Sequence, residues 1–134
     1  MAKRVNAEYV ARNVAYLESV AQQEDVQRLP KGILYKVLSS GQGASCEANS
    51  IVSVHYSGSL ISGLEFDTSR ANSYPEVFPL REVIEGWLIA LRAMRVGDRW
   101  QIFIPAEVGY GNRACGNIPA GSTLIFDVEL LAIS

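Results

Sequence analysis

Near the end of the chain the sequence reads Thr123-Leu124-Ile125-Phe126-Asp127-Val128-Glu129-Leu130-Leu131. A leucine, phenylalanine or valine stands at every second position from Leu124 to Leu130. Side chains two residues apart on a β-strand point to the same face of its sheet. The pattern therefore predicts a strand over residues 123–133 with one face buried in a core.

Three earlier segments show the same period of two, and glycines or an aspartate mark their ends: residues 33–39, 51–57 and 98–104. In the second segment, Tyr56 falls on the same face as Val52 and Val54, whereas His55 falls on the other face. We expect Tyr56 to point into the core and His55 to lie on the sheet surface.

Two segments have helical spacing instead. Residues 6–24 carry Val10, Val14, Leu17 and Ala21 with polar residues between them, which is typical of an amphipathic helix. Residues 82–94 carry apolar side chains three and four apart, and Gly97 follows them. We therefore predict an α+β fold in which a curved antiparallel β-sheet wraps around one short α-helix, preceded by an N-terminal amphipathic helix.

The break between the N-terminal helix and the sheet falls at a Leu-Pro-Lys-Gly sequence, residues 29–32. We place the boundary there, with the helix and linker in residues 1–30 and one domain in residues 31–134. A chain of 134 residues is long enough for one packed core.

The charge balance of twelve basic and fourteen acidic residues, without a basic run, argues against a nucleic-acid partner. Apolar runs fall far short of the ~20 residues that cross a bilayer, so no membrane partner is expected. The polar start predicts a cytoplasmic protein. A leader removed ahead of the first residue would instead place it in the periplasm or on a lipoprotein anchor.

Most catalytic patterns are missing from the sequence. His55 is the only histidine, and Cys46 and Cys115 stand far apart without ligand spacing, so we expect neither a metal nor a cofactor. The chain instead supplies aromatic residues at positions expected to face inward: Tyr56, Phe66, Trp87, Tyr110 and Phe126. Any one of these residues alone is best explained by core packing.

Their neighbours form an ordered set of short motifs. These are Leu-Glu-Phe-Asp-Thr-Ser-Arg at 64–70, Val-Ile-Glu-Gly-Trp at 83–87, Val-Gly-Tyr-Gly at 108–111, Ile-Pro at 118–119 and the strand quoted above. Together the motifs resemble the FKBP family of peptidyl-prolyl cis/trans isomerases over residues 32–133. The helical leader and Phe78-Pro79-Leu80 are most similar to the bacterial branch that includes macrophage infectivity potentiator.

The resemblance implies a metal-free, non-covalent isomerase that accelerates rotation about Xaa-Pro bonds and assists protein folding. Trp87 would form the pocket floor. The walls would come from five residues: Tyr56, Phe66, Val83, Ile84 and Phe126. The main-chain N–H of Ile84 and the Tyr110 hydroxyl would hold substrate carbonyls, and Ile118 would close the rim.

Asp67 would lie near the twisting carbonyl, although pairing with Arg70 or capping a turn explains this aspartate about as well. The loop over residues 112–117 departs from the family pattern, so the resemblance does not predict which residues flank the proline of a substrate.

The implied partners are proline-containing peptides or unfolded proteins, together with the macrolides tacrolimus or rapamycin. The single N-terminal helix is compatible with a monomer or with a homodimer, and an exposed apolar stripe on that helix would favour the homodimer. The main alternative is an FKBP-like protein-binding or chaperone module with little turnover. A small barrel that stacks single-stranded nucleic acid on its aromatics is a more distant rival, because the net charge is acidic.

Overall fold

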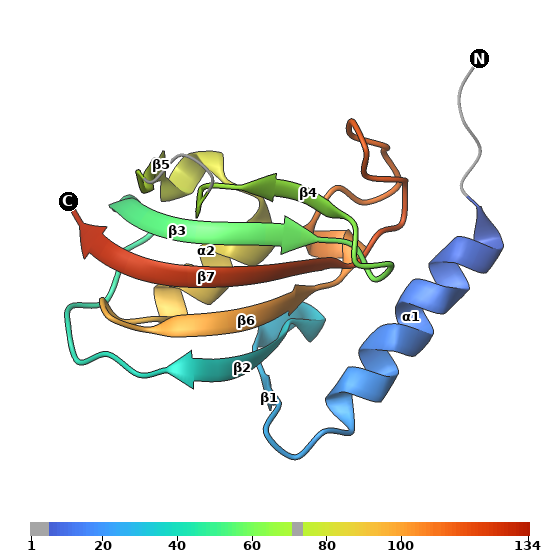
Figure 1. Ribbon diagram of the computed structural model, residues 1–134, viewed down its shortest axis with the longest axis horizontal. Coiled ribbons are helices and arrows are strands. Elements are labelled where there is room, and N and C mark those ends of the chain that lie inside the picture. Colours follow the sequence, from blue (N-terminus) through green and yellow to red (C-terminus); the bar gives the residue numbers. More distant parts are fainter. Residues whose placement is uncertain (1–5, 71–73) are drawn as a thin grey trace.

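The computed structural model describes residues 6–70 and 74–134. Within these residues one antiparallel sheet of seven strands has the order β1-β2-β6-β7-β3-β4, and β5 pairs with β3 beside β4 (Figure 1). The strands are β1 (Gln27–Arg28), β2 (Leu34–Ser39), β3 (Ile51–Ser59), β4 (Glu65–Thr68), β5 (Glu76–Pro79), β6 (Arg99–Ile104) and β7 (Leu124–Ile133).

The long strands follow the predicted alternation. Tyr56 is buried on β3, and Phe126 is buried on β7, where its neighbours along the chain are only half-buried. His55 faces outward, and its Nδ1 lies 3.2 Å from Ser69 Oγ. Strands β1, β4 and β5 were not predicted, because two to four residues are too short to show a period.

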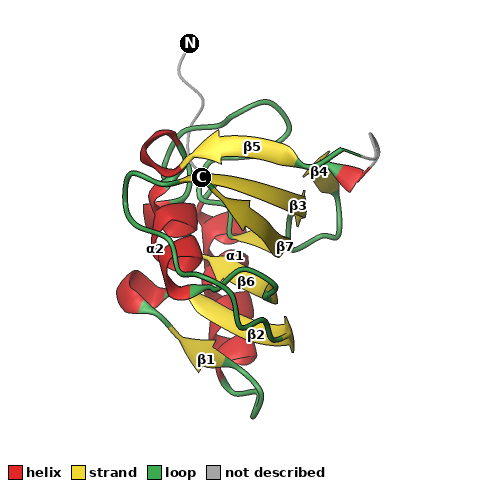
Figure 2. Ribbon diagram, turned by 90° about the vertical axis from the view of Figure 1, so that its left-hand side faces the viewer, coloured by secondary structure: helices red, strands yellow, loops and turns green. Residues whose placement is uncertain are grey.

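Helix α2 (Glu85–Ala93) lies on one side of the sheet, as Figure 2 shows, and fills its concave face. Trp87, Ala90 and Leu91 on this helix are buried against residues from β3, β6 and β7. The predicted helical segment began at residue 82, but Leu80–Glu82 forms a separate 3₁₀ turn. The α+β class, with a curved sheet around one short helix, is confirmed.

Helix α1 (Ala7–Ala21) packs against the opposite face of the sheet, near one end of β2, β6 and β7 (Figure 1). Its Val20 is buried with Leu34 and Phe103, two side chains that alternate away from the main core. The Asn6 side chain begins the helix by accepting the N–H of Tyr9 at 3.1 Å. The amphipathic N-terminal helix is confirmed.

Asn13 is the buried polar residue of this contact, with 2% of its surface exposed. Its Oδ1 accepts the main-chain N–H of Thr123 at 2.8 Å, at the start of β7, and its Nδ2 donates to the Tyr9 carbonyl at 2.8 Å. The predicted apolar stripe on α1 is therefore only partly exposed to solvent. Val14 is 48% exposed, whereas Val10 and Leu17 are half-buried against their own chain.

Strand β1 lies before residue 30, so the sheet begins within the segment predicted as helix and linker. The domain boundary itself stays a prediction. Among the described helices, none combines the length and the apolar character needed to span a bilayer.

Replacing Asn13 tests how α1 is held. Asn13→Ala leaves the buried N–H of Thr123 without its acceptor, so we expect the free energy of unfolding to fall by about 1–3 kcal/mol. Urea unfolding measures this change, and amide hydrogen exchange over α1 should accelerate. The exposed Gln22→Ala is the matched control and should stay within about 0.5 kcal/mol of the wild type. Equal stability of the two variants would contradict this role of Asn13.

Candidate active site

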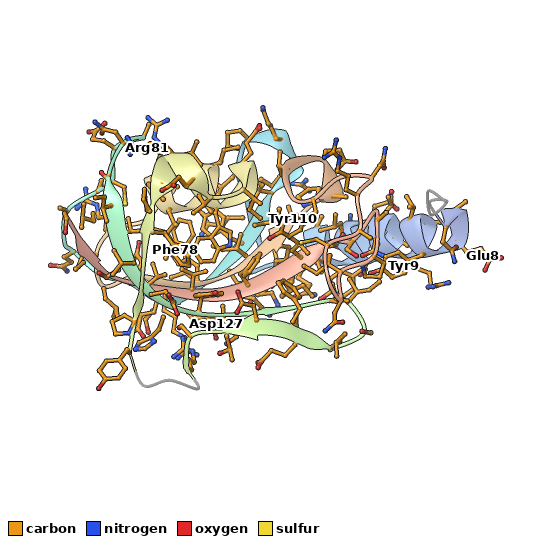
Figure 3. All side chains as sticks on the ribbon, turned by 90° about the horizontal axis from the view of Figure 1, so that it is seen from above. Glu8, Tyr9, Phe78, Arg81, Tyr110 and Asp127 are labelled. Carbon is orange, nitrogen blue, oxygen red and sulfur yellow. The ribbon has the colours of Figure 1, made fainter. Side chains whose placement is uncertain are left out.

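A cavity of about 320 Å³ opens on the concave side of the sheet, above the start of α2. Figure 3 shows two of its residues, Phe78 and Tyr110, on the same side of the sheet as α2. Its lining comes from β3, β4, β5, β7, α2 and the segments before α2 and after β6: Tyr56, Phe66, Asp67, Phe78, Glu82, Val83, Ile84, Trp87, Tyr110 and Phe126. Apolar lining with a few polar groups is typical of a ligand pocket.

Trp87 lies at the centre of this cavity, and three aromatic rings meet it edge to face. The ring centroids of Tyr56, Phe126 and Phe78 lie 5.1, 5.3 and 5.5 Å from it, at interplanar angles of 88°, 87° and 84°. These are preferred geometries for aromatic pairs, and they fix the orientation of each ring. The indole is 5% exposed and is one of the residues that line the cavity.

Gly58 on β3 makes room for a further aromatic contact. Phe66 and Phe126 meet edge to face at 5.6 Å, and they close over this glycine from the two neighbouring strands. A Cβ atom at residue 58 would lie 2.6 Å from Phe66 Cζ and 2.7 Å from Phe126 Cε1. Because Gly58 has no side chain, Phe66 and Phe126 can meet above it and form one wall of the cavity.

The polar group at the mouth is Asp67, whose carboxylate accepts the hydroxyl of Tyr56. Arg70 lies 3.4 Å from Asp127 on the outer face, so the alternative in which Asp67 pairs with Arg70 is not what the structure contains. Burial raises the pKa of Tyr56 well above its ordinary value, and the hydrogen bond to Asp67 and the Asp67 charge act in the same direction. Tyr56 is therefore a neutral donor at ordinary pH.

Two further residues that line the cavity carry donors without an internal acceptor among residues 6–70 and 74–134. The Ile84 carbonyl begins α2 by accepting the N–H groups of Trp87 and Leu88 at 3.0 and 3.2 Å, while its own N–H is unused. The Tyr110 hydroxyl also makes no hydrogen bond there. Its pKa is raised by burial, and then by nearby Cys115 and Asp67. Both groups can donate to the carbonyl of a bound ligand.

Eight of the nine residues predicted from the sequence line this cavity. They are Tyr56, Phe66, Asp67, Val83, Ile84, Trp87, Tyr110 and Phe126. Ile118 is different: it is 5% exposed and lines another opening, between the loop after β6 and helix α1. Its role at the rim of the aromatic cavity stays a prediction.

Phe78 and Glu82 line the cavity and were not predicted as site residues. The signal for Phe78 was present in the Phe78-Pro79-Leu80 motif, but strand β5 around it is too short to show which face it uses. Glu82 precedes α2 in the 3₁₀ turn, where no sequence pattern shows which way its side chain points. Among the described residues no cluster of histidine, cysteine and carboxylate side chains could hold a metal ion.

Comparison with known proteins gives the same family from sequence and from structure. Residues 43–131 match the family described as FKBP-type peptidyl-prolyl cis-trans isomerase. The chain is 45% identical over 124 residues to the FKBP-type 22 kDa peptidyl-prolyl cis-trans isomerase of Escherichia coli K12, covering 92% of this chain and 60% of that protein. It is 41% identical to the peptidyl-prolyl cis-trans isomerase Mip of Coxiella burnetii, covering 89% of this chain and 52% of the relative.

Solved structures agree with this match. A 1.6 Å crystal structure of a peptidyl-prolyl cis-trans isomerase from Pseudomonas syringae superimposes with a TM-score of 0.91 at 32% identity, covering 99% of both chains. The crystal structure of FkpA from Escherichia coli gives 0.91 at 37% identity, covering 96% of this chain and 60% of that one. The chain thus spans about half to three fifths of the length of the curated relatives.

Gly58→Ala tests the packing of the cavity wall. The added methyl group must displace Phe66 and Phe126, and such overpacking costs about 1–3 kcal/mol. We expect a lower free energy of unfolding and shifted ring resonances of both phenylalanines. Ser57→Ala, one residue earlier on β3 with a side chain on the outer face, is the matched control and should change neither. Unmoved rings in Gly58→Ala would show that the wall does not depend on this glycine.

Tyr56→Phe tests the buried hydroxyl through its pH dependence. Because the folded-state pKa lies above the unfolded value of about 10, Tyr56 contributes its full stabilisation below pH ~10 and loses it as the pH rises further. The free energy of unfolding of the wild type should therefore fall more steeply above pH ~10 than that of Tyr56→Phe. Tyr74→Phe, at a tyrosine that is 77% exposed, serves as the control. Parallel curves for wild type and Tyr56→Phe would contradict the raised pKa.

Proposed function

The chain belongs to the FKBP-type peptidyl-prolyl cis-trans isomerase family, and from this membership we propose that its aromatic cavity catalyses rotation about Xaa-Pro bonds in peptides and unfolded proteins. The observation that carries the proposal is the open cavity of about 320 Å³, which is lined by Trp87 and by aromatic rings that meet it edge-on. A pyrrolidine ring is a compact apolar group suited to such an opening.

The reaction needs no nucleophile. Rotation about a peptide bond costs ~18–20 kcal/mol because the C–N bond has partial double-bond character, and uncatalysed exchange at proline takes tens of seconds or more. The twisted transition state has lost amide resonance and is less polar at its carbonyl than the planar ground state. An apolar site that excludes water stabilises the twisted form more than the planar one, which is the requirement for catalysis.

The polar groups at the mouth would orient the substrate chain around the bond. The unused N–H of Ile84 and the Tyr110 hydroxyl would donate to carbonyls on either side of the proline. Asp67, already held by the Tyr56 hydroxyl, would lie near the rotating carbonyl. Holding both flanking segments lets the bond twist while the rest of the peptide stays in place.

A binding or chaperone module with little turnover is the second candidate function. The apolar cavity that supports catalysis would also retain an unfolded segment, so binding alone does not separate the two. Turnover does, because a module that only binds leaves the exchange rate of an Xaa-Pro peptide unchanged.

Tacrolimus or rapamycin would occupy the same cavity and inhibit turnover.

The cytoplasmic location and the homodimer through α1 also stay proposals. One relative, from Legionella longbeachae, is named Outer membrane protein MIP. Within this chain, Leu17 and Val20 of α1 already pack on the sheet, which leaves Val14 as its most exposed large apolar residue.

Trp87→Leu tests the catalytic cavity. The wild type should accelerate cis/trans exchange of an Xaa-Pro peptide in a protease-coupled or NMR assay, and rapamycin should suppress the effect. Loss of the indole floor should lower kcat/KM at least about tenfold, equivalent to ~1.4 kcal/mol of transition-state stabilisation.

The matched control is Trp100→Phe, because Trp100 is the second of two tryptophans and stacks on Tyr35 at 4.0 Å, away from the cavity. Urea unfolding of both variants separates lost turnover from lost folding. A folded Trp87→Leu variant with wild-type turnover would rule out this cavity as the active site. Peptide binding by a wild type that lacks turnover would favour the binding module.

A further inference from the structure

A second opening, of about 660 Å³, lies between the start of α1 and the loop that joins β6 to β7. We call it the arginine groove. Its lining comes from these two segments alone: Asn6, Tyr9, Arg12, Asn112, Arg113, Ala114, Gly116, Asn117, Ile118, Pro119 and Ala120. None of these residues lines the aromatic cavity.

The groove is basic, although the chain as a whole carries a net charge of −2. Arg12 comes from α1 and Arg113 from the loop, and neither forms an ion pair within residues 6–70 and 74–134. The Arg12 guanidinium lies 5.8 Å from the centroid of the Tyr9 ring, a contact that keeps it on the groove side of the helix. Glu8, the acidic residue of the first turn, lies at the same end of α1 as Tyr9 (Figure 3) but does not line the groove.

A series of buried and part-buried hydrogen bonds fixes the two sides of the groove relative to each other. Asn13, next to Arg12, accepts the N–H of Thr123 at 2.8 Å. Tyr9 donates its hydroxyl to Ser122 Oγ at 2.7 Å, and Ser122 donates in turn to the Pro119 carbonyl at 2.6 Å. The helix and the loop are therefore held together independently of any ligand. A preformed opening costs a ligand less ordering entropy than one assembled on binding.

The same loop also connects the groove to the aromatic cavity. It begins with Tyr110, a cavity residue, and its two ends are joined where Gly121 donates its N–H to the Gly111 carbonyl at 2.8 Å. In Figure 3, Phe78 of the cavity, Tyr110 and Tyr9 of the groove follow one another along the molecule. An extended polypeptide leaving the aromatic cavity past Tyr110 would meet the arginine groove next.

We propose that the arginine groove binds an acidic stretch of the same polypeptide whose proline occupies the aromatic cavity. This substrate preference rests on the proposed isomerase function. Two guanidinium groups facing one opening suit Asp or Glu carboxylates, which they can bind with paired hydrogen bonds. The side chains of Asn112 and Asn117 can bind the substrate main chain, since each amide offers both a donor and an acceptor, and Asn6, whose Oδ1 caps α1, can still donate from its Nδ2.

The test compares peptides that share one Xaa-Pro bond and differ in a flanking run of glutamates or of glutamines, placed at several distances before or after the proline. The wild type should process the best-spaced glutamate peptide about threefold to tenfold more efficiently in kcat/KM, as expected for two exposed ion pairs. The gain should reside in KM and should vanish in high salt, since exposed pairs are screened.

The double variant Arg12→Gln with Arg113→Gln should lose this preference and keep wild-type turnover of the glutamine peptide. Arg28→Gln with Arg92→Gln, two exposed arginines outside both openings, is the matched control and should retain the preference. In NMR titrations, a glutamate peptide without proline should shift the amides of residues 112–120 in the wild type and not in the groove variant.

The outcomes distinguish this proposal from the isomerase proposal. Equal turnover of the two peptides at every spacing, or a preference that survives in the groove variant, would overturn the acidic subsite and leave the isomerase intact. Absence of all turnover, with the loop amides still shifting, would overturn the isomerase and keep the groove as an acidic-peptide site. Tighter binding of a single-stranded oligonucleotide than of the glutamate peptide would overturn the assignment to a polypeptide ligand.

Discussion

The edge-on contact of three aromatic rings with Trp87 is the constraint on which the rest of the site depends. Tyr56, Phe78 and Phe126 come from three different strands, and each must meet the indole at nearly a right angle. These contacts fix the orientation of the rings, and the cavity of about 320 Å³ opens among them. The sheet must curve around α2 to bring these strands within reach of Trp87. The cavity therefore depends on the curvature of the sheet.

Much of this arrangement could be predicted because it rests on local patterns. A period of two in the long strands orients Tyr56 and Phe126, and helical spacing orients Trp87. The directions of Asp67 and Phe78 could not be obtained in this way, since β4 and β5 are four residues each and are defined by their pairing with β3. For Asp67 the sequence left pairing with Arg70 or a turn cap open beside a role in the site, and the position of Arg70 beside Asp127 excludes the pairing.

Helix α1 shows how a correct helix prediction can miss the contact that matters. Its apolar spacing through Val10, Val14 and Leu17 suggested a face for self-association, yet the buried side of the helix includes Asn13. An asparagine is tolerated there because it replaces a strand partner for the N–H of Thr123. The arginine groove was equally hidden, because Arg12 and Arg113 lie far apart in the chain and no basic run marks them.

Gly121 stands where the helix and the loop meet. Its φ of +80° favours glycine, and a Cβ there would lie 2.5 Å from Val10 Cγ2. Any side chain at residue 121 would therefore force the first turns of α1 away from the loop. The close seating of this helix on the domain thus depends on a single glycine.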